Sequence, residues 1–185
     1  MDNTKSMRLL MFESSNKADI KQLEIIYNEG HKLTVHCGYV AAGNQDIETL
    51  IWLYNHGCEI NTFTVIANVQ NFGNYVSNKD AKLPADEAYF MMLFSQRLCE
   101  CQNNYDTQIL DWLQSIKFKF NVNLIVKYAA LANNITALNW FVSHKYDIKY
   151  KEILMTDKQN MSFDIKDWFQ IKIIENDTYN AVICI

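Results

Sequence analysis

Histidine and cysteine side chains gather in the first third of the chain, and these residue types are common zinc ligands. His31 and His36 have an H-x3–5-H spacing that occurs in zinc sites. The full set is His31, His36, Cys37, His56 and Cys58. However, His56 and Cys58 lie where a repeated unit ends, and no closely spaced C-x2–4-C pair accompanies them. We therefore expect no metal site and no cofactor.

A C-x-C pair, Cys99-Glu100-Cys101, lies near the end of an expected helix. On a helix the two thiols point about 200° apart, so they cannot bind one metal ion or form a disulfide. The five cysteines are an odd number without framework spacing, which predicts reduced thiols in a cytosol-like compartment. They are Cys37, Cys58, Cys99, Cys101 and Cys184.

Nucleophilic catalysis requires Ser or Cys beside a His and an orienting acid. The four histidines, His31, His36, His56 and His144, all fall near turns. The sequence contains no nucleophile elbow, P-loop or dinucleotide-binding glycine motif. We expect a protein that is not an enzyme and has no catalytic residues. An enzyme on a helical scaffold is a further hypothesis, after the binding and assembly roles described below, and it predicts a deep pocket with convergent His and acid groups.

Composition indicates a well-packed helical protein. Hydrophobic residues make up 49% of the chain and charged residues 21%, which argues against disorder. Only 5 Gly and 1 Pro are present, too few for many short strands. The net charge of −4, with Lys and Arg thinly spread, argues against a nucleic-acid partner. The sequence lacks an apolar run of about 18 residues and a signal-like N-terminus, so we expect no membrane span and a cytoplasmic location.

Four segments share one apolar template. They are Ile20-x-x-Leu23-x-Ile25-Ile26, Ile47-x-x-Leu50-x-Trp52-Leu53, Thr107-x-x-Leu110-x-Trp112-Leu113 and Ile135-x-x-Leu138-x-Trp140-Phe141. We number template positions from the first residue, so the apolar positions are 1, 4, 6 and 7. The first and last intervals between the starts are short and nearly equal, and the middle interval is about twice as long. Such spacing predicts a solenoid of stacked helical units.

Each template is expected to form a helix with defined ends. Asp19 and Asp46 are placed to cap the first two helices, and Gly30 and Gly57 to end them in the left-handed conformation. The equivalent positions in the last two copies hold Lys117 and Lys145, where a positive φ costs more, so we expect looser or differently shaped turns there.

The tryptophans divide into two expected groups. Trp52, Trp112 and Trp140 occupy template position 6, so we expect them in the core. Trp168 lies outside the four copies and is expected to be an exposed aromatic residue.

Two regions depart from the template. Residues 74–101 read as an irregular insertion, with a loop followed by a long helix that begins at Pro84. The tail, residues 150–185, reads as a cap. Its β-branched runs around Glu175-Asn176-Asp177-Thr178 are compatible with a short β-hairpin, and a capping helix from Asp164 to Ile174 is the alternative.

The segment Ala41-Ala42-Gly43-Asn44-Gln45-Asp46-Ile47-Glu48-Thr49-Leu50-Ile51-Trp52-Leu53-Tyr54-Asn55-His56-Gly57-Cys58 resembles an ankyrin repeat. It is most similar to the divergent form, with a Trp-Leu pair and a Gly-Cys exit, that is common in proteins of giant DNA viruses. The segment from Ala129 to Phe141 is a second match. The Thr-Pro-Leu-His opening is missing and the period is shorter than the usual roughly 33 residues. The resemblance implies a curved α-solenoid and a protein-binding role, with no catalytic residues to transfer.

The sequence therefore predicts an all-α protein, an α-solenoid of stacked ankyrin-like helix-turn-helix repeats. We expect a single domain over 1–185, with regular units at 5–61 and 102–149, the insertion at 74–101 and a C-terminal cap at 150–185. The expected function is a non-enzymatic protein–protein interaction module, a viral protein acting in the host cytoplasm. Its partner is another protein, held along the concave face and the turns between units. The alternative is a structural subunit of a larger assembly, such as a virion component, that self-associates.

Overall fold

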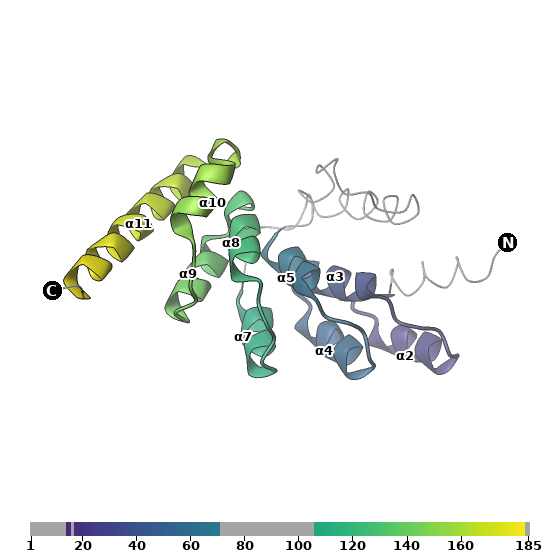
Figure 1. Cartoon of the computed structure of the whole chain (residues 1–185). Coiled ribbons are helices and arrows are strands. Elements are labelled where there is room, and N and C mark those ends of the chain that lie inside the picture. The colour runs from purple at the N-terminus through teal and green to yellow at the C-terminus, as the bar shows by residue number, and fades with distance from the viewer. Residues whose placement is uncertain (1–13, 16, 71–105, 184–185) are drawn as a thin grey trace. The chain divides into compact units, whose positions relative to one another are not determined.

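The computed structural model describes residues 14–15, 17–70 and 106–183, and every regular element in these ranges is helical (Figure 1). The all-α class expected from the sequence is therefore confirmed for this part of the chain. The chain divides into two compact units, Met1–Lys119 and Phe120–Ile185. This division does not test the expectation of a single domain, which stays a prediction. Residues 71–105, which include the expected insertion at 74–101, lie outside the described residues, as does most of the helix expected at 5–15.

The first unit contains helices of eight or nine residues. They are α2 (Ile20–Asn28), α3 (Val35–Gly43), α4 (Ile47–Asn55), α5 (Thr62–Val69) and α7 (Gln108–Ser115). Helix α3 packs against both α4 and α5. Helices α2, α4 and α7 carry the first three copies of the template, so we call them template helices. Helices α3 and α5 are intervening helices.

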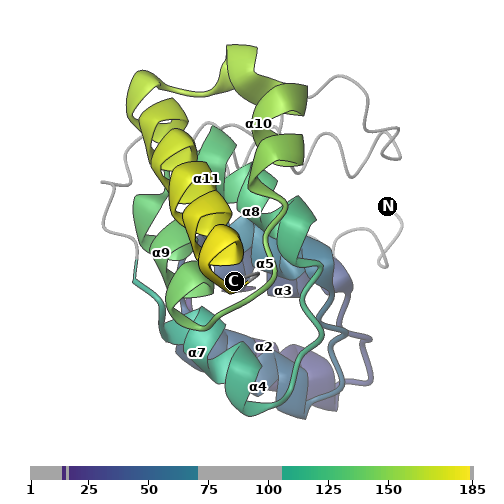
Figure 2. The ribbon, with the colours of Figure 1, turned by 60° about the vertical axis from the view of Figure 1, so that its left-hand side comes forward.

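The second unit begins with the same alternation and ends on a much longer helix. Its elements are α8 (Val122–Leu131), α9 (Ile135–Ser143), α10 (Tyr150–Asp157), a 3-10 turn at Lys158–Asn160 and α11 (Phe163–Ile183). The intervening helix α8 packs against the template helix α9 and against α10, and α10 packs against α11 (Figure 2).

The first two template helices begin at the expected caps. A carboxylate oxygen of Asp19 accepts the backbone N–H of Gln22 at 3.0 Å, and Asp46 does the same for Thr49 at 3.0 Å. Asn134 caps α9 in the same way. These bonds satisfy donors that the first turn of a helix leaves without a partner.

The template helices α2, α4, α7 and α9 all end in the same type of turn, so the expectation of looser or differently shaped turns at the lysines is wrong. Gly30 and Gly57 have φ values of 88° and 85°, and Lys117 and Lys145 have 58° and 57°. In all four, the N–H of this residue and that of the next return to carbonyls of the last helical turn; at Lys117 the bonds are Lys117 N to Gln114 O and Phe118 N to Leu113 O, both 2.9 Å. This Schellman pair satisfies two carbonyls, which offsets the cost of a left-handed lysine.

Only part of the predicted apolar stripe is core. Template positions 4 and 7 are at most 1% exposed in all four copies: Leu23, Ile26, Leu50, Leu53, Leu110, Leu113, Leu138 and Phe141. Position 3 is also buried in three copies, as Thr49, Ile109 and Ala137. Positions 1 and 6 are less buried in most copies, and Ile25 is 53% exposed. Because helical residues advance by about 100°, positions 3, 4 and 7 share one narrow arc, and position 6 lies beyond its edge.

Helix α11 carries a fifth copy of the template, so the β-hairpin alternative is wrong and the helical alternative was too short. It runs without a break through the segment expected to turn, Glu175 to Thr178. Ser162 caps its start, with Oγ 3.3 Å from the N–H of Ile165. The copy begins at Phe163, which follows Ile135 at the same interval that separates Ile135 from Thr107. Its positions 3 and 7, Ile165 and Phe169, are fully buried, whereas position 4 is a lysine.

Candidate binding surfaces

The histidines and cysteines expected not to bind metal are distributed over separate contacts. His31 Nε2 lies 4.0 Å from a carboxylate oxygen of Glu29, and the ring of His36 meets that of Tyr39 edge-on at 5.5 Å. His56 caps its own helix, as described below. Within the described ranges, no three His, Cys, Asp or Glu side chains come together in a group that could hold a metal ion. Cys99, Cys101 and Cys184 lie outside those ranges.

Cys37 and Cys58 are buried free thiols that both contact Thr34, the residue just before α3. Cys58 Sγ donates to the carbonyl of Thr34 at 3.3 Å, and the Thr34 hydroxyl lies 3.7 Å from Cys37 Sγ. Burial, and then the neighbouring Cys37, raise the pKa of Cys58 from 9.0 to about 12. The Cys58 thiol therefore stays protonated at neutral pH, where it packs as a small apolar group instead of acting as a nucleophile.

A Trp-x-x-x-His pair closes two of the template helices. His56 stacks on Trp52 with centroids 3.9 Å apart, and its Nδ1 lies 2.7 Å from the Trp52 carbonyl oxygen. His144 and Trp140 repeat this at 4.1 Å and 2.8 Å. Because a carbonyl oxygen can only accept, Nδ1 is the donor in both. The sequence shows this spacing twice. We expected these histidines only near turns, and the prediction missed that each one caps its helix by donating to the tryptophan carbonyl.

In three copies, the tryptophan at template position 6 contacts the preceding template helix. In the first unit, Tyr27 at position 8 of α2 meets Trp52 edge-on at 6.1 Å, and Tyr54 of α4 meets Trp112 edge-on at 5.5 Å. In the second unit, Trp168 Nε1 donates to Asn139 at position 5 of α9, at 3.0 Å. The contact between Tyr54 and Trp112 places α7 directly beside α4, although the long interval of the array separates their templates in the sequence.

These contacts revise the expectations for the tryptophans. Trp140 is 5% exposed and belongs to the core as expected, whereas Trp52 and Trp112 are only half-buried. Trp168 is also half-buried, so the expectation that it is an exposed residue is wrong.

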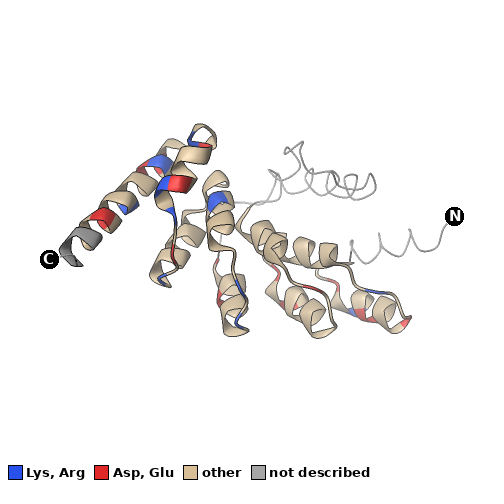
Figure 3. Ribbon diagram, in the orientation of Figure 1, with Lys and Arg blue, Asp and Glu red and all other residues tan. Residues whose placement is uncertain are grey.

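The intervening helices of the first unit present an uncharged aromatic surface. Helices α3 and α5 contain no Lys, Arg, Asp or Glu (Figure 3). Asn61 Nδ2 donates to the hydroxyl of Tyr39 at 3.0 Å, which ties the start of α5 to α3. Asn61 also forms a capping box with Thr64, and this box holds the first turn that carries Phe63, a residue 47% exposed. We call His36, Tyr39, Asn61 and Phe63 the aromatic patch.

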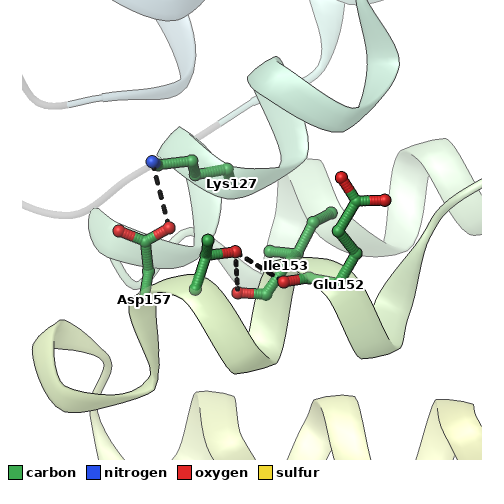
Figure 4. A network of polar contacts seen from close by, with 5 residues as sticks. Lys127, Glu152, Ile153 and Asp157 are labelled. Atoms are coloured by element: carbon green, nitrogen blue, oxygen red, sulfur yellow. Dashed lines mark hydrogen bonds and ion pairs between the residues drawn. The ribbon is translucent and has the colours of Figure 1, made fainter.

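The corresponding helices of the second unit are charged. Lys127 of α8 pairs with Asp157 of α10 at 3.0 Å, and the nearby Thr156 hydroxyl donates to the carbonyl oxygen of Glu152 (Figure 4). The Asp157 side chain is only 14% exposed, so the pair is partly shielded from water. This ion pair joins two successive intervening helices.

A small cleft lies between α10 and α11. Its volume is about 250 Å³, and its lining consists of Ile148, Lys149, Tyr150, Lys151, Glu152, Ile173, Asn176 and Asp177. Lys151 and Asp177 pair across it at 2.9 Å. Burial, and then the carboxylates of Glu175 and Asp147, raise the pKa of Tyr150. The lining contains no histidine and Lys151 is paired, so it does not have the convergent His and acid groups that the enzyme hypothesis predicts.

No protein-family model, curated protein or solved structure matches this chain. None of the helices in the described ranges is both long and apolar enough to cross a membrane.

Proposed function

We propose that this chain is an ankyrin-like α-solenoid that binds another protein and catalyses no reaction of its own. The observation that carries the proposal is the recurrence of one unit: an intervening helix, a tight left-handed turn, a capped template helix and a Schellman exit. Gln45 and Asn133 make that tight turn before α4 and α9, with φ values of 58° and 57°. Stacked units of this kind form extended surfaces for partners.

The aromatic patch is the proposed contact surface. Partly exposed aromatic side chains on rigid elements are typical anchors of protein interfaces. Because α3 and α5 carry no formal charge, the patch suits an apolar or uncharged polypeptide segment better than a phosphate backbone. The resemblance to the divergent ankyrin repeats of giant DNA viruses supports a viral protein that acts in the cytoplasm of an infected cell.

Affinity capture with quantitative mass spectrometry tests this proposal. The bait is the full chain, compared with the Phe63→Ala variant and with Tyr179→Ala, which truncates an aromatic residue on α11 that is 67% exposed. We expect a defined set of proteins to be retained by the full chain and by Tyr179→Ala, and to be lost from Phe63→Ala. Equal capture by all three baits would contradict the aromatic patch as the binding surface. Thermal melts of the three proteins check that each is folded.

A further inference from the structure

Helix α11, the last described template helix, exposes the face with which earlier template helices receive their neighbour. In the earlier units, the receiving residues are at positions 5 and 8: Asn139 receives Trp168, and Tyr27 and Tyr54 receive Trp52 and Trp112. In α11 these positions are Asp167 and Gln170. Phe163, Ile171 and Ile174 lie on the same side of the helix and are 73%, 54% and 66% exposed. Positions 1, 5, 8 and 12 form one stripe of a helix, and Ile171 at position 9 lies at the edge of that stripe.

Helix α2, the first described template helix, exposes the other face of that contact, the side that carries position 6. Its position 6 is Ile25, which stands where Trp52, Trp112 and Trp168 stand in later copies, and Ile25 is 53% exposed. Lys21 lies one turn earlier on the same face and is also exposed. The charges match, because Lys21 is basic and the α11 stripe carries the acidic Asp167.

We propose that the α11 face of one copy binds the α2 face of a second copy, which continues the stack from chain to chain. The pairing brings Ile25 and Lys21 of one copy against Ile171, Ile174 and Asp167 of the next. It joins the same two faces that meet three times within the chain, where position 6 of one template helix contacts position 5 or 8 of the preceding one. The interface is heterologous, so each copy uses two different surfaces and the assembly grows into a ring or a filament.

Such an assembly corresponds to the structural role that is the alternative expectation from the sequence. The inference rests on the repeat architecture proposed above, but it does not require that a different protein binds the aromatic patch. If the parent chain stays monomeric and Phe63→Ala abolishes the capture of partners, only the assembly is overturned. A chain that assembles but captures nothing would overturn only the binding function.

Sedimentation velocity at increasing protein concentration tests the assembly. The weight-average sedimentation coefficient of the full chain is expected to rise with concentration, while Ile25→Asp and Ile174→Asp each remain monomeric. Both side chains are exposed, so both variants should retain the far-UV circular dichroism of the parent. Met155→Asp is the matched control: Met155 is 85% exposed on α10 and outside both faces, so its variant should assemble like the parent.

Mixing the two variants identifies the head-to-tail geometry. Ile25→Asp keeps an intact α11 face and Ile174→Asp keeps an intact α2 face, so an equimolar mixture should form a dimer that grows no further. The charge exchange is a second test: Lys21→Glu or Asp167→Lys alone should weaken assembly, and the double variant should recover it. A monomeric parent chain, assembly that survives Ile25→Asp, or a mixture that stays monomeric would each overturn the proposal.

Discussion

Lysines in left-handed turns show how one residue can be suboptimal while its surroundings hold it in place. Lys117 and Lys145 have the same φ as the non-glycine turn residues Gln45 and Asn133, although a left-handed backbone costs an L-residue roughly 1 kcal/mol. The two backbone hydrogen bonds of the Schellman turn and the burial of the helix before it together outweigh this cost. The turn geometry is therefore set by the unit and does not depend on a glycine.

Replacing either lysine with glycine is expected to stabilise the protein. Lys145→Gly and Lys117→Gly should each raise the free energy of unfolding by about 0.5–1 kcal/mol, because glycine adopts positive φ without steric cost. Urea denaturation followed by circular dichroism measures the change. Lys119→Gly is the control: Lys119 is exposed and has no positive φ, so its replacement should bring no gain. Equal effects of all three substitutions would show that the left-handed lysines are not strained.

At the scale of the element, the template helix has two functions on different sides. Positions 3, 4 and 7 form the core, and position 6 meets the preceding unit. The core side of the helix is therefore mostly aliphatic, while a tryptophan at position 6 contacts a tyrosine or an asparagine of the preceding template helix. Trp140 is an exception because Phe120 and Tyr146 also surround it, with centroids 5.7 and 5.8 Å away, and leave it 5% exposed.

Truncation of the equivalent tryptophans should therefore have unequal costs. Trp140→Ala is expected to lower the free energy of unfolding by about 3–5 kcal/mol, the usual cost for a buried aromatic side chain. Trp52→Ala should cost clearly less, because its indole is already half-exposed in the folded protein. Each substitution also removes the indole on which a histidine stacks, so the loss of this stacking energy is common to both variants. Urea denaturation at one pH compares them, and equal losses would show that burial does not separate the two positions.

At the scale of the whole molecule, the chain consists of two compact units, Met1–Lys119 and Phe120–Ile185. Units in repeat proteins interact chiefly with their neighbours, so stability varies along the chain. Helix α11 closes the second unit by burying Ile165 and Phe169.

Phe169→Ala is therefore expected to destabilise the second unit selectively. Hydrogen exchange followed by mass spectrometry should show faster exchange in peptides from α8 to α11, and little change in peptides from α2 to α5. Leu50→Ala, a fully buried residue of α4, provides the reciprocal variant and should accelerate exchange in the first unit. Uniform acceleration along the chain by either variant would show that the two units unfold as one.

Local sequence preferences were sufficient to predict the helical class and most helix ends. Asp19 and Asp46 cap helices, and Gly30 and Gly57 end them, because these preferences depend on a few neighbouring backbone groups. The candidate surfaces were less predictable. The aromatic patch joins Tyr39 to Asn61 across two helices, and the Trp-x-x-x-His pair depends on the geometry of a helix end.

The sequence by itself determined that the chain is helical and that its units recur at one short interval or its double, since both follow from short-range patterns. Only the tertiary structure decided which side of each template helix is core, which tryptophans are buried and that α11 is a fifth copy. The segment Glu175 to Thr178 is polar enough for a turn and equally able to continue a helix. Burial of Ile165 and Phe169 anchors α11 as a template helix, and that burial depends on long-range packing, which local propensity does not contain.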